Sequence, residues 1–313
     1  MATTRRFRVR SRIEAADGVV RLALEPTDGA PLDPWRPGAH IDLCGQGDLI
    51  RQYSLCGDPD ADAYEVAVLQ VPEGRGGSNW VHDTLVEGAE VDVAGPRNNF
   101  ELESSDRYLF VAGGIGITPL LPMVRAVAAR GADYEFVYGG RTRRSMAFAD
   151  DLVGEFGDRV RLVPAEEHGL LDLPTILGEE VPGRRVYSCG PEPLLAALEE
   201  LMATRAGETL HLERFSPKEP VDTGGDAFDV EIASTGATVR VEEGQSIIEA
   251  LATVGVDVDF SCQEGTCGTC ETGVLGGVPD HRDSVLTAEE QQENDCMMIC
   301  VGRCRQGPLV LDL

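Results

Sequence analysis

No stretch of this sequence stays apolar over the roughly 20 residues that a membrane-spanning helix requires, so we expect no such helix and no membrane partner. The first eight residues are basic but lack the apolar core of a signal peptide, which favours a cytoplasmic location. Basic residues are scarce, because 27 Lys and Arg face 54 Asp and Glu, and a net charge of −27 disfavours nucleic acid as a partner. The nine cysteines are an odd number, which argues against a disulfide framework.

A length of 313 residues suits two or three compact domains. The first hundred residues contain short apolar segments separated by Gly, Pro and Asp, which is typical of strands joined by tight turns. We predict a small antiparallel β-barrel over residues 1–103. Its expected strands are 7–15, 19–26, 40–43, 50–56 and 64–71.

Beyond residue 103 the pattern changes to short buried strands that alternate with helices, which predicts a doubly wound parallel sheet in an α/β domain over 104–218. The expected strands are 108–112, 134–138, 160–163 and 185–188, and the expected helices are 119–130 and 193–204. A polar Pro- and Gly-rich linker over 219–227 precedes a third domain at 228–313. There we expect a hairpin of 228–233 with 238–241, and a helix over 246–254 with a capping box of Ser246 and Glu249.

Acidic residues are concentrated in this last third of the chain. Residues 222–313 hold 18 Asp and Glu but 4 Lys and Arg, a net charge of −14, while −13 is spread over the longer remainder. A field of this strength favours docking of a basic partner by long-range steering. Solubility is the alternative explanation, and we prefer it for the charge outside this third.

The last third also carries a distinctive cysteine pattern, Cys262-x4-Cys267-x2-Cys270 followed by Cys300. This spacing is typical of the plant-type ligand set for a 2Fe–2S cluster, and the intervening glycines let the backbone approach the cluster closely. Four thiolates also suit zinc, although zinc sites usually pair two C-x2-4-C knuckles and one is present here. Cys296 and Cys304 are the alternatives to Cys300 as the fourth ligand.

A Gly-rich turn, Gly113-Gly-Ile-Gly-Ile-Thr118, lies between a buried strand and a helix. At this position a parallel sheet presents backbone amides and a helix dipole to a pyrophosphate, although a purely structural turn explains the glycines equally well. The acidic residue expected about 20 positions later to hold an NAD ribose is missing. The second strand leads instead into Arg141-Thr-Arg-Arg, which faces either an adenosine phosphate or solvent. Cys189-Gly-Pro191 ends another strand at the same sheet edge, and in isolation Cys189 is a small core residue.

Two segments of the first domain offer groups that bind an anion or an aromatic ring. Arg51-Gln-Tyr53-Ser54 alternates as a strand, and Arg75-Gly-Gly-Ser78 precedes an expected helix over 80–85. With Ser78 as N-cap, this turn would expose backbone amides to a phosphate. An ordinary strand and an ordinary capped turn remain the alternatives.

These motifs follow a specific order, namely 51–55, 75–78, 113–119, 189–191 and then the four cysteines. The order covers essentially the whole chain and resembles the phthalate dioxygenase reductase family. The resemblance implies an FMN-binding β-barrel, an NAD-binding α/β domain and a C-terminal plant-type ferredoxin domain of the β-grasp α+β fold. Related ferredoxin–NADP reductases usually bind FAD, but the turn at 75–78 is similar to the family's FMN phosphate site and so implies FMN.

The same resemblance implies the site residues. Catalytic roles fall to Ser54, Thr118, Cys189 and Phe215. Flavin contacts fall to Arg51, Gln52, Tyr53, Ser54, Val68, Gly76, Gly77 and Ser78. Nucleotide contacts fall to Gly113, Gly114, Gly116, Thr118, Arg141, Cys189, Gly190 and Pro191, and the cluster ligands are Cys262, Cys267, Cys270 and Cys300. His281 is interpreted as a structural loop residue, because electron transfer requires no proton shuttle there.

The resemblance further implies that NADH gives hydride to FMN, which passes electrons singly to the cluster. The preference for NADH over NADPH rests on the resemblance alone. The sequence has no Rieske-type Cys/His pairs, so we expect a separate acceptor, either a Rieske-type oxygenase or a cytochrome P450. A redox sensor without turnover and a zinc-bearing binding module are the alternatives from other classes. We expect a monomer.

Overall fold

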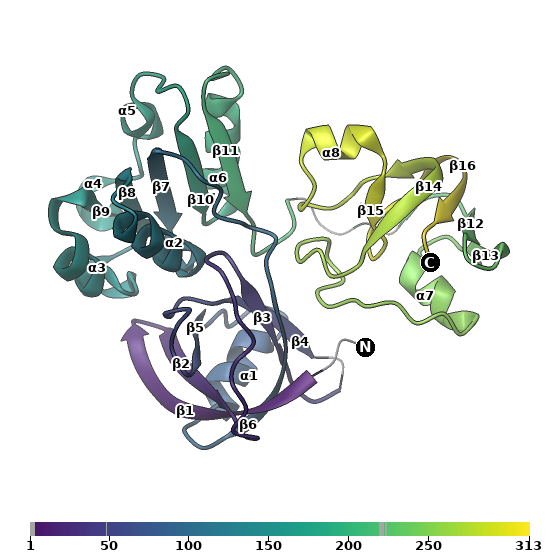
Figure 1. Cartoon of the computed structure of the whole chain (residues 1–313), viewed down its shortest axis with the longest axis horizontal. Helices are drawn as coiled ribbons and strands as arrows, with labels where there is room; N and C mark the ends of the chain where they lie inside the picture. Colours follow the sequence, from purple (N-terminus) through teal and green to yellow (C-terminus); the bar gives the residue numbers. More distant parts are fainter. Residues whose placement is uncertain (1–3, 48, 219–221, 223) are drawn as a thin grey trace. The chain divides into compact units, whose positions relative to one another are not determined.

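The computed structural model describes residues 4–47, 49–218, 222 and 224–313. They form two compact units, Thr4–Glu213 and Arg214–Leu313, each of which can be followed along the chain in Figure 1. The three-domain boundaries at 103/104, 218/219 and 227/228 stay predictions. The predicted linker 219–227 includes residues 219–221 and 223, which lie outside the described residues.

The first hundred residues form an antiparallel sheet with the strand order β4-β3-β6-β1-β2-β5. Leu55, directly after β4, forms an antiparallel bridge with Val66 of β5, so the two outer strands of this order meet and the sheet closes into a barrel. The barrel core is built from the apolar side chains that alternate along β1, β2 and β3. The elements are β1 (Thr4–Ala16), β2 (Val19–Pro26), β3 (His40–Cys44), β4 (Ile50–Ser54), β5 (Tyr64–Leu69), α1 (Gly77–Thr84) and β6 (Glu90–Arg97).

The next sheet is parallel throughout, with the order β11-β10-β7-β8-β9. Apolar clusters fill both of its faces, one beneath α2 and α3 and one beneath α5 and α6, which explains why β7 is a continuous apolar run. The elements are β7 (Arg107–Gly113), α2 (Ile117–Ala129), β8 (Asp133–Gly140), α3 (Ala149–Phe156), β9 (Val160–Pro164), α4 (Ala165–His168), α5 (Leu173–Leu177), β10 (Arg185–Cys189), α6 (Glu192–Met202) and β11 (Thr209–Glu213), with 3-10 turns at Gly114–Gly116, Arg143–Ser145 and Gly157–Arg159.

The barrel and the parallel sheet share a core. Val19, Cys56 and Ala67 of the barrel belong to the same apolar cluster as Ile117 and Leu120 of α2. Packing of this kind makes the first unit a single body, because apolar side chains from both sheets are removed from water together.

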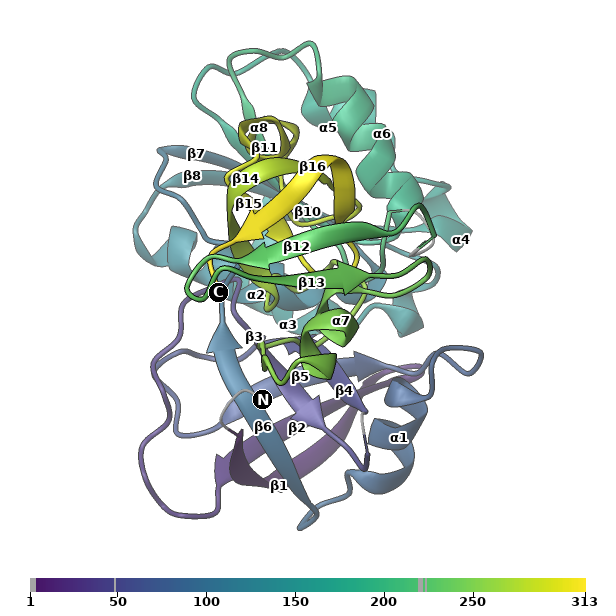
Figure 2. The same ribbon diagram turned by 90° about the vertical axis from the view of Figure 1, so that its right-hand side faces the viewer.

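The second unit contains a mixed sheet with the order β13-β12-β16-β14-β15, in which β12 and β16 are parallel. Helix α7 packs beside β13, as Figure 2 shows, and completes a β-grasp arrangement. Its capping box of Ser246 and Glu249 is formed as predicted. The elements are β12 (Phe228–Ile232), β13 (Ala237–Val241), α7 (Ile247–Thr253), β14 (Glu271–Asp280), α8 (Ala288–Glu293), β15 (Cys296–Met298) and β16 (Arg303–Leu311).

The predicted three-part fold class is therefore confirmed, although the structure contains elements that were not predicted from the sequence, among them β6, β14, β15 and β16. Sequence reasoning missed β6, because Gly95-Pro96 inside it is a turn signal, although β6 pairs with both β1 and β3. It also placed the start of the first helix at residue 80, whereas α1 begins at Gly77. Within the described part of the chain, no helix is both long and apolar enough to cross a membrane.

Candidate functional site

Four buried cysteines, Cys262, Cys267, Cys270 and Cys300, come together in the second unit. The thiol of Cys262 contacts those of Cys267 and Cys300, and Cys300 also contacts Cys270. In the described residues no three His, Cys, Asp or Glu side chains are arranged as a site for a single ion. The contacts include the pairs 262–267 and 270–300, and two pairs of thiolates are the donor set that a cluster of two irons requires. The residues present therefore fit a 2Fe–2S cluster.

Backbone amides point at the same sulfurs. The N–H groups of Glu264 and Thr266 donate to Cys262 Sγ at 3.3 and 3.4 Å, and the N–H of Cys262 donates to Cys267 Sγ at 3.4 Å. Hydrogen bonds from Cys267 and Cys300 and from these amides lower the pKa of Cys262, although burial opposes the shift. The opposite shift is found at Cys267 and Cys300, whose contacts with Cys262 raise their pKa values, so it is the amide hydrogen bonds that favour negative charge on sulfur in this loop.

The two alternative fourth ligands make other contacts. Cys304 lies in β16 and its thiol donates to the Gly307 carbonyl oxygen at 2.7 Å. Cys296 lies in β15, where burial raises the pKa of its thiol to about 12. The three cysteines of the 262–270 loop are brought together with Cys300, so the structure favours the ligand set that includes Cys300.

In the parallel sheet, the Gly-rich turn and Cys189-Gly-Pro191 meet at the carboxyl ends of β7 and β10. These adjacent strands are the point where the strand order reverses, which is where open α/β sheets bind ligands. A Cβ added at Gly116 would lie 2.2 Å from the Cys189 carbonyl oxygen, and one at Gly113 would lie 2.7 Å from Pro191 Cδ. The glycines are therefore required by the close approach of the two turns.

Thr118 and Cys189 are both buried beside this junction. The Thr118 hydroxyl donates to the Ile115 carbonyl oxygen at 3.1 Å, which fixes the turn into α2. Burial, with a further contribution from Glu213, raises the pKa of the Cys189 thiol far above its ordinary value. Cys189 is thus a neutral, shape-defining group rather than a thiolate nucleophile.

The predicted phosphate-binding turn lies at the start of α1. Gly76 is the N-cap, with a left-handed φ of 81°, and Ser78 lies inside the first turn, where its hydroxyl accepts from the Val71 N–H at 2.9 Å. The prediction of Ser78 as N-cap is therefore wrong, because the glycine adopts the turn conformation without a side-chain cap. Arg51 covers the helix start: its guanidinium donates to the Arg75 carbonyl oxygen at 2.9 Å, and a Cβ at Gly77 would lie 2.4 Å from Arg51 Cγ. A cation beside first-turn amides suits a phosphate.

The other predicted site residues are more dispersed. Gln52 Nε2 donates to Asp42 Oδ1 at 3.2 Å, while burial raises the pKa of Tyr53 to about 12. The side chain of Val68 is buried in the barrel core. Arg141 is exposed after β8. Phe215 belongs to the second unit and is 43% exposed, so its position beside a flavin stays a prediction.

Sequence reasoning gave no role to Glu213, which ends β11 at the same edge of the sheet. The Ser54 hydroxyl donates to Glu213 Oε2 at 3.3 Å and thereby links the barrel strand β4 to β11. Part of the Glu213 surface remains accessible, but the protein atoms around its carboxyl desolvate it and raise its pKa to about 8. Its position at the carboxyl end of a strand, the edge at which parallel sheets bind ligands, is the feature by which the sequence could have indicated a role for it.

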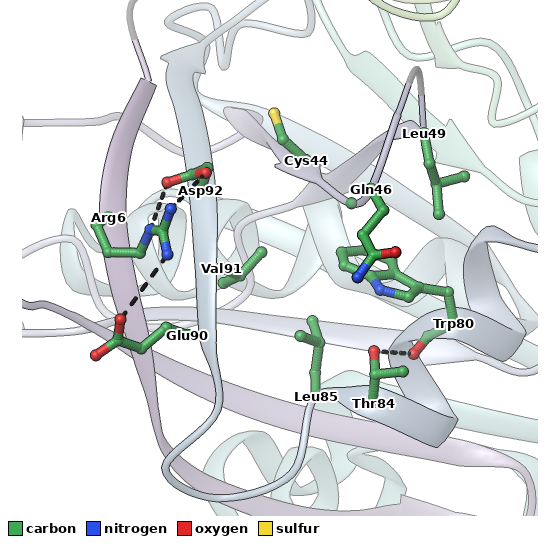
Figure 3. Close-up of a pocket in the computed structure, with 11 residues that line it drawn as sticks. Arg6, Cys44, Gln46, Leu49, Trp80, Thr84, Leu85, Glu90, Val91 and Asp92 are labelled. Carbon is green, nitrogen blue, oxygen red and sulfur yellow. Dashed lines mark hydrogen bonds and ion pairs between the residues drawn. The ribbon is translucent and has the colours of Figure 1, made fainter.

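A cavity of about 520 Å³ opens elsewhere on the barrel, between the end of β3, α1 and β6 (Figure 3). Trp80 and Leu85 line one wall, and Arg6 is held at the opposite side by Asp92 and Glu90. None of the predicted flavin residues lines it. This cavity is therefore not the predicted flavin site, and the flavin site is described from the contacts among its predicted residues.

Comparison with known proteins places this geometry in a family. A model described as a 2Fe-2S iron-sulfur cluster binding domain matches residues 230–305, which include all four cysteines. Phenoxybenzoate dioxygenase subunit beta of Ectopseudomonas oleovorans is 42% identical over 311 residues, or 98% of this chain and 97% of the relative. The solved phthalate dioxygenase reductase, described as a modular structure for electron transfer from pyridine nucleotides to [2Fe–2S], matches with a TM-score of 0.71 and 33% identity over 99% of this chain and 98% of that chain. The chain belongs to the phthalate dioxygenase reductase family.

Membership of the phthalate dioxygenase reductase family confirms the predicted class of oxidoreductase, a reductase component of an oxygenase system. It also supports the predicted cofactors, FMN, NADH and a 2Fe–2S cluster, and favours the cluster over zinc. A second solved structure, an intact type IV self-sufficient cytochrome P450 monooxygenase, matches with a TM-score of 0.92 and 45% identity over 99% of this chain. The chain spans about two fifths of that protein, since the match covers 41% of it.

Proposed function

We propose that this chain binds NADH at the β7/β10 junction and FMN against β4 and the start of α1, and delivers electrons through the second unit to a Rieske-type oxygenase. The observation that carries the proposal is the hydrogen bond between Ser54 and Glu213, which joins the two predicted cofactor regions within one compact unit. When bound, the nucleotide supplies hydride, and the flavin and cluster convert this two-electron supply into single-electron steps.

The residues of the first unit bind the flavin and the nucleotide and orient them. Arg51 and the α1 amides hold the phosphate of FMN, and the glycine turn that precedes α2 offers the N-terminus of that helix to the nucleotide pyrophosphate. Cys189, which stays protonated, and Thr118 shape the nicotinamide pocket and exclude water from it. Glu213 and Ser54 hold a proton between them at the edge of this pocket.

The charges near the nucleotide ribose support NADH over NADPH. Arg143 is paired with Asp150, and Arg144 with Asp17 of the barrel at 3.2 Å, so both cations are already engaged. Among the described arginines of 141–144, this leaves the exposed Arg141 to contact an adenosine phosphate. A 2′-phosphate is bound best by several arginines at once, so this arrangement suits the nucleotide without that phosphate.

A Rieske-type oxygenase is proposed as the acceptor because two proteins named above, phenoxybenzoate dioxygenase subunit beta and phthalate dioxygenase reductase, are components of dioxygenase systems. A cytochrome P450 is the second candidate, and the 45% identity to the reductase-containing P450 favours it. Stopped-flow reduction of one purified protein of each class by the NADH-reduced chain distinguishes them. Fast reduction of the P450 with none of the Rieske protein would contradict the proposal.

Anaerobic titration with NADH and NADPH in parallel tests the proposed cofactors and their order. We expect NADH to bleach the flavin and then the cluster, with released FMN identified by chromatography and about two irons per chain. Reduction by NADPH alone, release of FAD, or bound zinc would each overturn the corresponding assignment. Steady-state NADH-dependent reduction of cytochrome c excludes a sensor without turnover. Light scattering is expected to show a monomer.

A further inference from the structure

Residues 283–286 of the second unit form a turn that is closed by an acidic side chain. Asp283 Oδ2 accepts hydrogen bonds from the N–H groups of Val285 and Leu286 at 3.1 and 2.8 Å. The side chains of Val285 and Leu286 pack against the apolar core of this unit. A short carboxylate that binds amides two and three residues later holds the intervening backbone in one conformation. Asp283 therefore fixes this turn to the core.

The carboxyl group of Asp283 is enclosed by protein. Its side chain is 1% exposed, and its other oxygen, Oδ1, lies 3.8 Å from Nδ1 of His281, whose side chain is 4% exposed. Water therefore competes little for this carboxyl group, and hydrogen bonds in such surroundings are stronger than those at the surface. The 283–286 turn is thus a firm support for whatever packs against it.

The 283–286 turn contacts the loop that carries three of the cluster ligands. Ser284, in the middle of the turn, donates its N–H to the Gly265 carbonyl oxygen at 2.8 Å. Gly265 has a left-handed φ of 67°, and a Cβ there would lie 2.9 Å from Asp283 Cα. The two backbones therefore touch directly, which a glycine permits and a larger residue does not.

The same glycine also lies against the segment of the fourth ligand. A Cβ at Gly265 would lie 2.7 Å from Cγ2 of Val301, the residue that follows Cys300. On the other side of Cys300, the Ile299 N–H donates to the Cys270 carbonyl oxygen at 3.3 Å. The position of Gly265 thus affects both of the segments that supply ligands.

The peptide group between Gly265 and Thr266 is held from both ends. Its carbonyl oxygen accepts from Ser284, and its N–H, that of Thr266, donates to Cys262 Sγ at 3.4 Å. Hydrogen bonds in such a chain polarise and strengthen one another. An amide directed at a ligand sulfur stabilises the reduced cluster more than the oxidised one, because reduction adds a negative charge.

We propose that Asp283 is a positioning residue for the cluster, because it holds the Ser284 N–H that orients the peptide group donating to Cys262. This inference rests on the proposed passage of electrons through the cluster. Without the Asp283 side chain the turn loses two hydrogen bonds, and the 265–266 peptide group is no longer held toward the sulfur. The cluster then becomes easier to lose and harder to reduce.

The test compares variants of Asp283 in the full-length, cofactor-loaded protein. In Asp283→Ala we expect the visible absorption of the cluster to disappear about tenfold faster in excess chelator, since the loss of two hydrogen bonds shifts a local opening equilibrium by about that factor. The EPR signal of the dithionite-reduced cluster is expected to change. Asp283→Asn is expected to restore the rate and the signal, because its amide oxygen closes the same turn.

The Ala and Asn variants both lack the carboxylate, so the difference between them reports the hydrogen bonds rather than the charge. The cluster midpoint potential is therefore expected to be lower in Asp283→Ala than in Asp283→Asn. Asp283→Ser, whose hydroxyl closes the turn more weakly, is expected to lie between them. It keeps the comparison measurable if the Ala variant is purified without its cluster.

Thr287→Ala is the matched control. The Thr287 hydroxyl also accepts a backbone N–H, that of Glu290 at 3.2 Å, but this bond caps α8. The control is expected to change neither the rate, the potential nor the EPR signal. Equal behaviour of the Ala and Asn variants, or an equal effect in Thr287→Ala, would overturn the inference. Failure of the proposed function is distinguishable, because NADH would then leave the cluster of the unmodified protein oxidised while dithionite still reduces it.

Discussion

Ser54 of the barrel and Glu213 of the parallel sheet are joined by a hydrogen bond of 3.3 Å between Oγ and Oε2. The two residues are separated by most of the first unit in sequence, and they end β4 and β11 respectively. Desolvation raises the pKa of Glu213 to about 8, although the Ser54 hydroxyl lowers it. A carboxyl group with this pKa carries a proton near neutral pH, beside the residues assigned to flavin and nicotinamide.

The raised pKa of Glu213 makes the stability of the protein depend on pH. Between about pH 4.5 and pH 8 the folded protein retains a proton that the unfolded chain has released, so the contribution of Glu213 to the free energy of unfolding decreases as pH rises through this window. Glu213→Gln removes that decrease. We expect the difference in Tm, variant minus unmodified, to grow from pH 5 to pH 9 by calorimetry; a constant difference would contradict the assignment.

The contact between the two glycine turns predicts the effect of Gly116→Ala. A Cβ there meets the carbonyl oxygen and carbon of Cys189 at 2.2 and 2.4 Å, and backbone atoms cannot move aside cheaply. We expect a loss of about 1–3 kcal/mol in the free energy of unfolding. Flavin reduction by NADH is expected to slow on the order of tenfold or more, because the nucleotide site is displaced.

Gly154→Ala is the control for that substitution. Gly154 lies in α3, has no atom within 4 Å of an added Cβ, and has no positive φ. The same change is expected to raise stability by about 0.5–1 kcal/mol through helix propensity and to leave flavin reduction unaltered. If both variants lose activity equally, the close approach at Gly116 is not the cause.

The choice of Cys300 as fourth ligand is tested by iron content. Cys300→Ser is expected to reduce iron from about two per chain to near zero and to abolish the visible absorption of the cluster. Cys304→Ser changes a thiol that bonds to the Gly307 carbonyl and is expected to retain both irons. Retention of the cluster in the first variant together with its loss in the second would reverse the assignment.

A buried ion pair predicts a large effect on stability far from the cofactors. Arg184 Nη2 lies 2.6 Å from Glu208 Oε1, and Arg205 pairs with the other carboxylate oxygen. Burial opposes ionisation of Glu208, but hydrogen bonds from Arg205, the Val181 N–H and Arg184 lower its pKa overall. Arg184→Met is expected to cost about 3–5 kcal/mol in urea unfolding, since it leaves a buried charge without one partner.

The exposed pair Arg125 and Glu155 is the comparison for this ion pair. Arg125→Met is expected to change stability by no more than about 1 kcal/mol, because water solvates both charges when they separate. A cost in Arg184→Met no greater than in Arg125→Met would show that burial does not govern the energetics of the pair.

Charge predicts how the acceptor docks. The net charge of −14 on residues 222–313 favours a basic surface on the partner. Raising ionic strength from about 0.01 M to 0.15 M shortens the screening length from about 30 to 8 Å and is expected to slow bimolecular reduction of the oxygenase. NADH-dependent flavin reduction provides the internal control. An acceptor rate independent of salt would exclude docking through the acidic unit.

The sequence by itself determined the class of the fold and the chemistry of the cluster. Apolar periodicity distinguished the barrel from the parallel sheet, because a strand buried on one face alternates whereas β7, buried on both, does not. The cysteine spacing identified the ligand loop, since three of the four ligands are local in sequence. The capping box of Ser246 and Glu249 could also be predicted from the sequence, because both partners lie within one turn of helix.

Only the tertiary structure decided the features that depend on distant segments. The pairing of β6 with β1 and β3 outweighs the turn signal of Gly95-Pro96, and Gly76 rather than Ser78 caps α1. The desolvation of Glu213, its bond to Ser54, and the hydrogen bonds of Arg282 to the carbonyl oxygens of Asp222 and Gly224 each require groups far apart in the chain to be brought together. A local pattern cannot encode them, because burial and charge at a residue are set by what packs against it.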